Sequence, residues 1–327
     1  MKPALWLMVA ALPLWAQPKL LTNAKVDTRS ASAGLEQTFR AALNAQPQPA
    51  WIGYAVPSTR TYNLGCDFVN RSDFNQAGVV HLEPPDQAVI LFRVEANAVD
   101  RIRTLSPDCE IDAGGVPVHW LSDVQPAQSV AFLATYVDQH MNNLNGALNA
   151  LAMHADPAAD RMLDHYLAAD QLQSVRLRAV SMLTPYRGRH GFDSLKGLIA
   201  NDKDVKIRER AVQSLANSKE PEAIDLLISL ARTDADARIR SQAVGELARK
   251  PGPRILTTLT GALDDPDEAV KRRAVTALQQ LPDGQGIPLL IQVVKTTKND
   301  TLRKQAMNSL KNSQDPRALS FFEDVLK

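Results

Sequence analysis

The sequence predicts a mainly α protein, in which a small α+β domain precedes a carboxy-terminal α-solenoid of about six helix pairs. One observation is a helical segment that recurs every 31 or 32 residues between positions 175 and 310. A second is a set of strand-like runs between positions 51 and 121. The length of 327 residues and the hydrophobic share of 45% indicate about two globular domains and exclude wholesale disorder.

Residues 1–16 have the outline of a secretory signal peptide. Lys2 supplies a positive start, an uncharged apolar run follows from Ala4 to Leu12, and Ala16 is a small residue suited to cleavage. The run is shorter than the roughly 20 residues of a membrane-spanning helix. We therefore expect an exported protein, periplasmic or secreted, that is not an integral membrane protein. The alternative is an uncleaved helix buried in the fold.

Two cysteines, Cys66 and Cys109, stand in the amino-terminal half of the chain. In an oxidising compartment, two cysteines in one domain favour a disulfide, and we predict that these two are paired. Two free thiols or a shared metal site are the alternatives.

We expect residues 17–30 to form a mobile leader and residues 31–140 to form the α+β domain. The expected elements are a helix at 35–43, strands at 51–56, 79–83, 88–94, 99–105 and 116–121, and a helix at 129–141. Trp51, Tyr54 and Trp120 are aromatic residues that could bind a cell-wall polymer if exposed, although a buried core is the expected place for them.

The densest group of chemically active residues is the segment from Asp108 to Gly115. Asp108, Glu110 and Asp112 alternate with apolar residues, and with His119 they make a possible ligand or cation site. The calcium loop of an EF-hand requires glycine at its sixth position and glutamate at its twelfth, which here are Ala113 and His119. A strand with Cys109 inward and the acids outward is therefore the favoured interpretation.

In the repeated segment, the residues follow one another in a fixed order: an aliphatic residue, a cation, two variable residues, an alanine, a second aliphatic residue, two variable residues and a leucine. The five alanines are Ala179, Ala211, Ala243, Ala274 and Ala306. A more degenerate sixth copy surrounds Ala147. Each copy is followed by a polar link and a second apolar helix, and such helix pairs bury their apolar faces only when stacked in a row.

This repeated helix resembles the short HEAT-like repeats of the bilin-lyase and HEAT superfamily, over residues 141–327. The whole chain resembles bacterial exported HEAT-repeat proteins, which implies no particular activity. HEAT-like repeats serve in scaffolds, adaptors and a few enzymes. Deoxyhypusine hydroxylases of this type bind iron with His-Glu pairs, and no His-Glu dipeptide occurs here. Bilin lyases act in the cytoplasm, which conflicts with the expected signal peptide.

One cation per repeat stands at the same position. These residues are Arg176, Arg208, Arg240, Lys271 and Arg303. The favoured interpretation is a structural ladder, in which each cation pairs with an acid four residues earlier: Asp204 with Arg208, Asp236 with Arg240 and Asp267 with Lys271. These acids also suit helix amino termini. The alternative is a surface for anionic ligands or nucleic acid.

Residues 141–327 hold 27 basic and 23 acidic residues, a net charge of +4, which is too small for the usual nucleic-acid binder. The six histidines form no zinc-binding spacing on one helix, and His154 and His165 are expected at the surface. Cys109 with His119 makes only a weak candidate dyad.

We therefore expect no catalytic residues, metal or cofactor, and a scaffold or adaptor that binds another exported or membrane-associated protein. An enzyme or a cell-wall-binding or ligand-binding module, with its site in the amino-terminal domain, is the alternative.

Overall fold

The computed structural model describes residues 21–59, 86–139, 143–250 and 252–325. The chain divides into two compact units, Met1–Tyr166 and Leu167–Lys327. The predicted signal peptide, Cys66, the predicted strand at 79–83, His81 and His140 lie outside the described residues.

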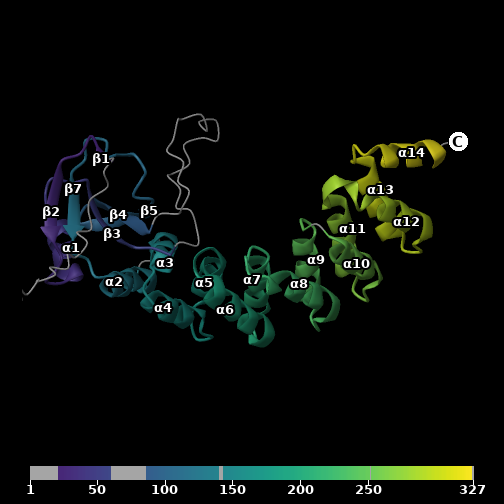
Figure 1. Ribbon diagram of the computed structural model, residues 1–327, viewed down its shortest axis with the longest axis horizontal. Coiled ribbons are helices and arrows are strands. Elements are labelled where there is room, and N and C mark those ends of the chain that lie inside the picture. Colours follow the sequence, from purple (N-terminus) through teal and green to yellow (C-terminus); the bar gives the residue numbers. More distant parts are fainter. Residues whose placement is uncertain (1–20, 60–85, 140–142, 251, 326–327) are drawn as a thin grey trace, which may run out of the picture. The chain divides into compact units, whose positions relative to one another are not determined.

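The first unit contains a five-stranded mixed sheet with the order β2-β7-β3-β4-β5 (Figure 1). Its strands are β2 (Val26–Ser30), β3 (Ala50–Pro57), β4 (Gln87–Glu95), β5 (Ala98–Leu105) and β7 (Val118–Ser122). A separate parallel pair joins β1 (Leu21–Thr22) to β6 (Ile111–Asp112). The unit's helices are α1 (Leu35–Leu43), α2 (Pro126–Gln139), α3 (Leu144–Met153) and α4 (Ala158–Leu167).

An aromatic cluster joins one face of the sheet to helices α1 and α2. The ring centroid of Phe92 lies 4.9 Å from that of Phe39 on α1 and 5.9 Å from that of Phe132 on α2. The opposite face holds a second apolar cluster that includes Leu91, Cys109 and Trp120. Both faces are therefore apolar, as the nearly continuous hydrophobic run of β4 requires.

A glycine allows this second cluster to pack closely. A Cβ atom on Gly53 would lie 2.6 Å from Leu91 Cδ2 and 3.1 Å from Trp120 Cζ3. A larger residue there would displace the indole ring from the sheet.

The segment predicted as a mobile leader is partly a pair of strands. Leu21–Thr22 forms β1, and β2 pairs with β7 in parallel, with Val26 opposite Val118 and Ser30 opposite Ser122. The domain boundary also differs from the expected one, because the degenerate repeat belongs to the first unit. Its helix α3 packs on β5: a Cβ atom on Gly146 would lie 2.7 Å from Ile102 O, and Asn143 Nδ2 donates to Val99 O over 3.0 Å.

The second unit consists of helix pairs, as the sequence predicts. The first helices of the pairs are α5 (Gln173–Tyr186), α7 (Val205–Leu215), α9 (Ala237–Leu247), α11 (Glu268–Gln280) and α13 (Asp300–Lys311). The second helices are α6 (Gly188–Asn201), α8 (Glu222–Thr233), α10 (Pro253–Gly261), α12 (Ile287–Thr296) and α14 (Pro316–Val325). The 3-10 turns η2 (Ala262–Asp264) and η3 (Pro282–Gly284) stand in the connections.

The first helices of successive pairs contact one another and form one layer, which we call the A layer. The repeated alanines are all fully buried, because their single methyl group allows neighbouring helices to approach closely. Asp204, Asp236, Asp267 and Asn299 are the amino-terminal caps of α7, α9, α11 and α13. Each side chain accepts a hydrogen bond from a backbone N–H in the first turn, as the sequence predicts for the three aspartates.

Candidate interaction surface

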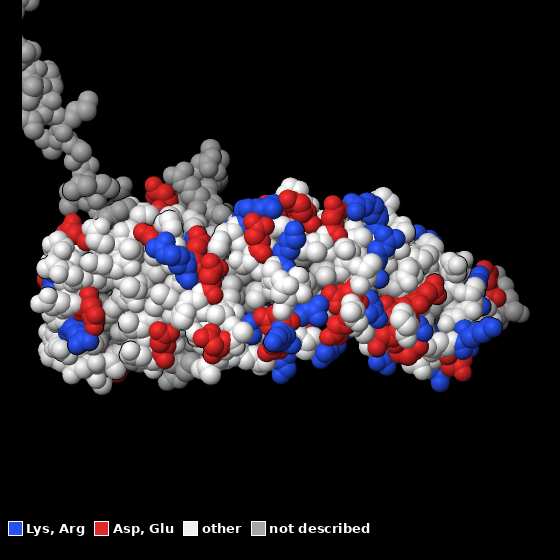
Figure 2. Space-filling view, turned by 90° about the horizontal axis from the view of Figure 1, so that it is seen from below, with Lys and Arg blue, Asp and Glu red and all other residues white. Residues whose placement is uncertain are grey.

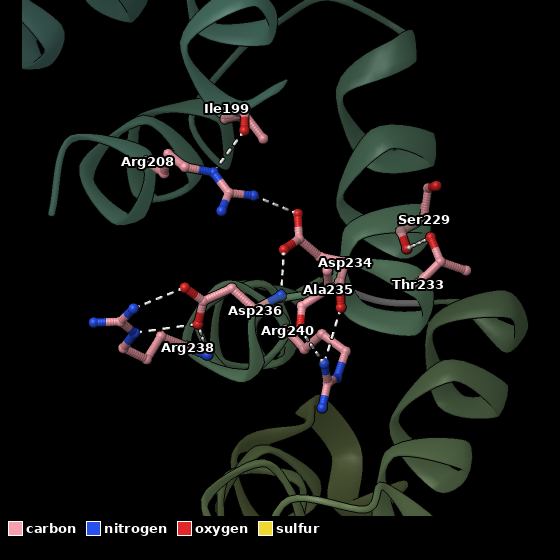
Figure 3. Close-up of polar contacts among 9 residues, drawn as sticks. All are labelled: Ile199, Arg208, Ser229, Thr233, Asp234, Ala235, Asp236, Arg238 and Arg240. Atoms are coloured by element: carbon pink, nitrogen blue, oxygen red, sulfur yellow. Dashed lines mark hydrogen bonds and ion pairs between the residues drawn. The ribbon is translucent and has the colours of Figure 1, made fainter. Parts of the chain in front are cut away.

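The repeated cation of α7 joins three segments of the solenoid (Figure 3). Arg208 Nε donates to Ile199 O at the end of α6 over 2.8 Å, and its Nη2 donates to Asp234 Oδ2 after α8 over 2.7 Å. Asp234 Oδ1 also accepts the backbone N–H of Asp236 over 2.9 Å. The two side chains are only 19% and 10% exposed. The ion pair is therefore largely buried. Its arginine donates a hydrogen bond to a carbonyl at the end of α6, where backbone carbonyls lack partners within the helix.

The same contact recurs in the neighbouring repeats. Arg176 Nε donates to Leu167 O over 3.0 Å and its Nη2 pairs with Asp202. Arg240 binds Asp265 with two parallel hydrogen bonds of 2.7 and 2.8 Å. Asp202 and Asp265 likewise accept the backbone N–H two residues further along. We call these three arginine–aspartate pairs the buried ladder.

The ladder changes at the last repeats. Thr297 occupies the position of Asp234 and Asp265, and Lys271 pairs instead with Glu268 on its own helix over 2.8 Å. Arg303 pairs with Asp300 over 2.7 Å, and its side chain is 43% exposed. The link between α11 and α13 therefore lacks the arginine–aspartate pair of the preceding repeats.

The expected pairing with an acid four residues earlier is wrong for Arg208, Arg240 and Lys271. The side chain of Asp204 accepts from Gln173 over 2.6 Å and caps α7, and the side chain of Asp236 binds Arg238 and caps α9. Asp267 is likewise a cap, whose side chain accepts from Ala269 N. Among the described residues, none of these three aspartates forms an ion pair with the cation four residues later. The acids that hold the arginines stand 25 or 26 residues later, in the next link.

A second row of long polar side chains stands two residues after each of the five repeated cations. Its members are Arg178, Arg210, Gln242, Arg273 and Gln305, which we call the outer row. The three arginines are exposed, and both glutamines are partly exposed. Two members reach back across the preceding A-layer helix: a Cβ atom on Gly245 would lie 2.5 Å from Arg273 Nε, and Gln305 Nε2 donates to Thr276 Oγ1 over 3.0 Å. Arg273 and Gln305 thus link neighbouring helices of the A layer.

One carboxylate interrupts the positive charge of the outer row. Glu246 accepts a hydrogen bond from Gln242 Nε2 over 2.8 Å. Burial raises the pKa of Glu246 above its ordinary value, and the nearby cations Arg249, Arg273 and Lys250 partly oppose that rise. On the face drawn in Figure 2, acidic and basic side chains of the repeats are interspersed. That mixture differs from the single-sign field of a nucleic-acid interface.

The structure does not bring the candidate cation ligands together. Asp108, Glu110 and Asp112 are exposed in the segment after β5, where Asp112 Oδ1 accepts the N–H of Gly114 over 2.7 Å. His119 is buried on β7, with its Nδ1 atom 3.4 Å from Asp27 Oδ2. Within the described ranges, no group of three or more His, Cys, Asp and Glu side chains could hold a metal ion.

Cys109 and His119 do not form a dyad. Cys109 is buried in the cluster that contains Trp120, and His119 is the next residue to Trp120 on the same strand. Neighbouring residues of a strand point to opposite faces, so the Cys109 sulfur and the His119 imidazole face different sides of the sheet. The pairing of Cys109 with Cys66 stays a prediction, because Cys66 lies outside the described residues.

A hydrogen-bonded chain that the sequence did not indicate lies inside the first unit. His154 Nδ1 lies 2.8 Å from Ala150 O, His154 Nε2 lies 2.9 Å from Ser129 Oγ, and Ser129 Oγ lies 2.8 Å from the hydroxyl of Tyr54. A carbonyl only accepts, so the Nδ1 atom of His154 donates to Ala150 O, and the Ser129 hydroxyl donates to the Tyr54 hydroxyl. All three residues are 0% exposed, which corrects the expected surface position of His154. A substrate cannot reach this serine–histidine pair.

The aromatic residues considered for polymer binding belong mainly to the core. Tyr54 and Trp120 are buried. Trp51 is partly buried, and its ring lies 5.8 Å from the guanidinium carbon of Arg93. Of the helices in the described part of the chain, none combines the length and the apolar character needed to cross a membrane.

These features define a repeat protein of the α-solenoid class, joined to a small α+β unit. The family model for HEAT repeats matches residues 166–248, 192–279 and 255–327, so this part of the chain consists of HEAT repeats. The repeats make the second unit a repeat-based interaction module. No curated protein matches the chain significantly.

Solved structures give distant similarities. The complex of CpcE and CpcF of phycocyanin lyase from Nostoc sp. PCC7120 is 22% identical, with a TM-score of 0.37, over 47% of this chain and 99% of that one. YibA of Escherichia coli is 19% identical, with a TM-score of 0.41, over 62% of this chain and 78% of that one. A designed armadillo repeat protein in complex with the peptide (KR)4 is 18% identical, with a TM-score of 0.32, over 57% of this chain and 99% of that one.

Proposed function

We propose that the protein is an exported, non-enzymatic scaffold that binds another exported or membrane-associated protein through the outer row of its HEAT repeats. The contrast between the two rows of cations carries this proposal. Arg176, Arg208 and Arg240 use their guanidinium groups inside the fold. Arg178, Arg210 and Arg273 keep exposed side chains on the A layer.

The spacing of the outer row favours an extended segment with acidic side chains. Packed helices lie about 10 Å apart, and an extended chain rises about 3.3 Å per residue, so one repeat corresponds to about three residues of the partner. The proposed segment therefore carries a carboxylate for Arg178 and another about three residues away for Arg210. Guanidinium groups bind carboxylates with two parallel hydrogen bonds, which gives such a row selectivity for acidic side chains.

Two further observations support the proposal. Export is supported by the apolar segment at residues 1–16, and sequencing the amino terminus of the exported protein should find Gln17 first. The full burial of Ser129 and His154 supports a role without catalysis at that pair. A mature protein that keeps Met1 would contradict export by this route.

Site-specific photocrosslinking in intact cells tests the surface. A photoreactive amino acid at Gln213, exposed on α7 beside Arg210, should crosslink a defined protein partner. The matched control is Ser229, exposed on the second helix α8 of the same repeat. Crosslinks from Ser229 and none from Gln213 would place the interaction outside the A layer and contradict the proposal.

A further inference from the structure

Strand β2 forms an open edge of the sheet in the first unit. It lies at one end of the strand order, next to β7, and Figure 1 shows it at the outer side of the sheet. In the described part of the chain, no second strand pairs with it. Its first residue, Val26, is 39% exposed, and Thr28 and Ser30 are also exposed. An edge of this kind can pair with another strand.

The hydrogen bonds to β7 show which backbone groups point outward. Lys25 O accepts from Val118 N over 2.9 Å, and Ala31 N donates to Ser122 O over 2.8 Å, so the odd-numbered residues bond to β7. The backbone groups of a strand alternate in direction. The N–H and C=O groups of Val26, Thr28 and Ser30 therefore point away from the sheet. Among the described residues no backbone group pairs with them, and they form a row of three donors and three acceptors.

The charged side chains of β2 are complementary to their own copies. Asp27 and Arg29 lie on one face of the sheet, where Arg29 Nη2 lies 2.7 Å from Asp27 Oδ2. In an antiparallel pair of two β2 strands centred on Thr28, Asp27 of each strand stands opposite Arg29 of the other. Directly opposed residues of that kind have Cβ atoms about 4.5–5.5 Å apart, close enough for an ion pair.

We propose that β2 is a homodimer interface, in which two copies of this chain pair antiparallel about a two-fold axis at Thr28. Val26 of one copy then pairs with Ser30 of the other, and the two Thr28 residues pair with each other. This register uses every outward N–H and C=O group of both strands. Because the two β2 strands become neighbours, the two five-stranded sheets form one continuous sheet across the axis.

The strand has only five residues, so the interface is small. We expect a dissociation constant in the micromolar range, roughly 1–100 μM, as for small and reversible interfaces. The dimer is therefore measured by sedimentation velocity on the purified full chain over a concentration series that spans this range.

Thr28→Pro is the sharpest backbone variant. Proline removes an N–H group that points outward, so the pairing with β7 is kept while the centre of the dimer is lost. We expect its dissociation constant to rise at least about 100-fold, since two central hydrogen bonds are lost and the rings meet at the axis. Thr28→Ala keeps the N–H and should dimerise like the parent chain. Thermal melts of both variants check that the unit is folded.

A charge exchange tests the register independently of backbone effects. Asp27→Arg presents two cations on each strand, and Arg29→Asp presents two carboxylates. Each variant alone should be monomeric, because like charges oppose one another across the axis. An equimolar mixture should form heterodimers, in which every cation again faces a carboxylate.

A parent chain that stays monomeric above about 100 μM would overturn the proposal, since the expected affinity would then be absent. A dimer that Thr28→Pro leaves intact, or a mixture of the charge variants that stays monomeric, would likewise overturn it. If the Thr28→Pro variant still dimerises, the chains associate through another surface.

Discussion

Replacing Arg208 by alanine removes two contacts of the buried ladder with one side chain. The hydrogen bond to Ile199 O is lost, and Asp234 loses its cation while its side chain stays only 10% exposed. Hydrogen bonds to charged groups contribute about 1.5–3 kcal/mol, and breaking a fully buried ion pair costs about 3–5 kcal/mol. Asp234 keeps its bond from Asp236 N, and both side chains retain some contact with water. We therefore expect a loss of about 2–3 kcal/mol in the free energy of unfolding.

Urea unfolding followed by far-ultraviolet circular dichroism measures this loss, provided that the dependence of free energy on urea keeps its slope. Two variants are matched controls. Arg208→Met keeps most of the apolar stem, so its difference from Arg208→Ala reports packing. Arg210→Ala removes an exposed cation two residues away and should cost no more than about 0.5 kcal/mol. An equal loss for Arg208→Ala and Arg210→Ala would refute the structural role of the ladder.

Three further predictions concern the described contacts. Lys271→Arg combined with Thr297→Asp should extend the ladder and stabilise the solenoid by about 1–2 kcal/mol beyond the sum of the single variants; additive effects in a double-mutant cycle would contradict it. The hydrogen bonds from Arg240 hold the pKa of Asp265 below its ordinary value of 3.8. The ionised carboxylate therefore stabilises the fold at higher pH, and this stabilisation is lost as the pH falls through the lowered pKa. Asp265→Asn should therefore reduce the acid dependence of unfolding below about pH 4, and an unchanged dependence would contradict the assignment. Ser129→Ala removes the hydroxyl that hydrogen-bonds the Tyr54 hydroxyl and His154 Nε2 in the core, and it should cost about 2–3 kcal/mol in thermal or urea unfolding. A neutral effect would exclude this buried chain as a stabilising contact.

The fold of the repeats is predictable from the sequence because its signal is local and recurs. Each repeat carries its own helical pattern and the same buried alanine, and the first helices of four repeats begin at a capping Asp or Asn, so the copies support one another. The strands β3, β4, β5 and β7 are similarly marked by their apolar residues and flanking turns. The strand β2, which precedes α1, could not be predicted in this way. Its residues are mostly polar, and it becomes a strand only by pairing with β7, about 90 positions later.

The partners of the buried-ladder arginines also could not be predicted from the sequence. Spacing along one helix identifies neighbours three or four residues apart, and it predicts Asp204 as the partner of Arg208. The actual partner, Asp234, stands in the next link, and only the stacking of helix pairs brings it close. The outer row occupies one of the two positions between the repeated cation and alanine that the sequence pattern leaves variable, although Arg or Gln stands there in all five copies. Periodicity alone could not show that one row is buried and the other exposed.

In the proposed function, the outer row binds the partner while the buried ladder maintains the fold. The most direct measurement compares partner crosslinking from Gln213 in two triple variants with the same change in charge. One replaces Arg178, Arg210 and Arg273 by glutamate, and the other replaces Lys196, Arg232 and Arg254, exposed cations of the second helices, by glutamate. We predict that the first variant loses the crosslinked partner and the second retains it, with both remaining folded in thermal melts. Retention of the partner by the first variant and its loss from the second would contradict these separate roles of the two rows.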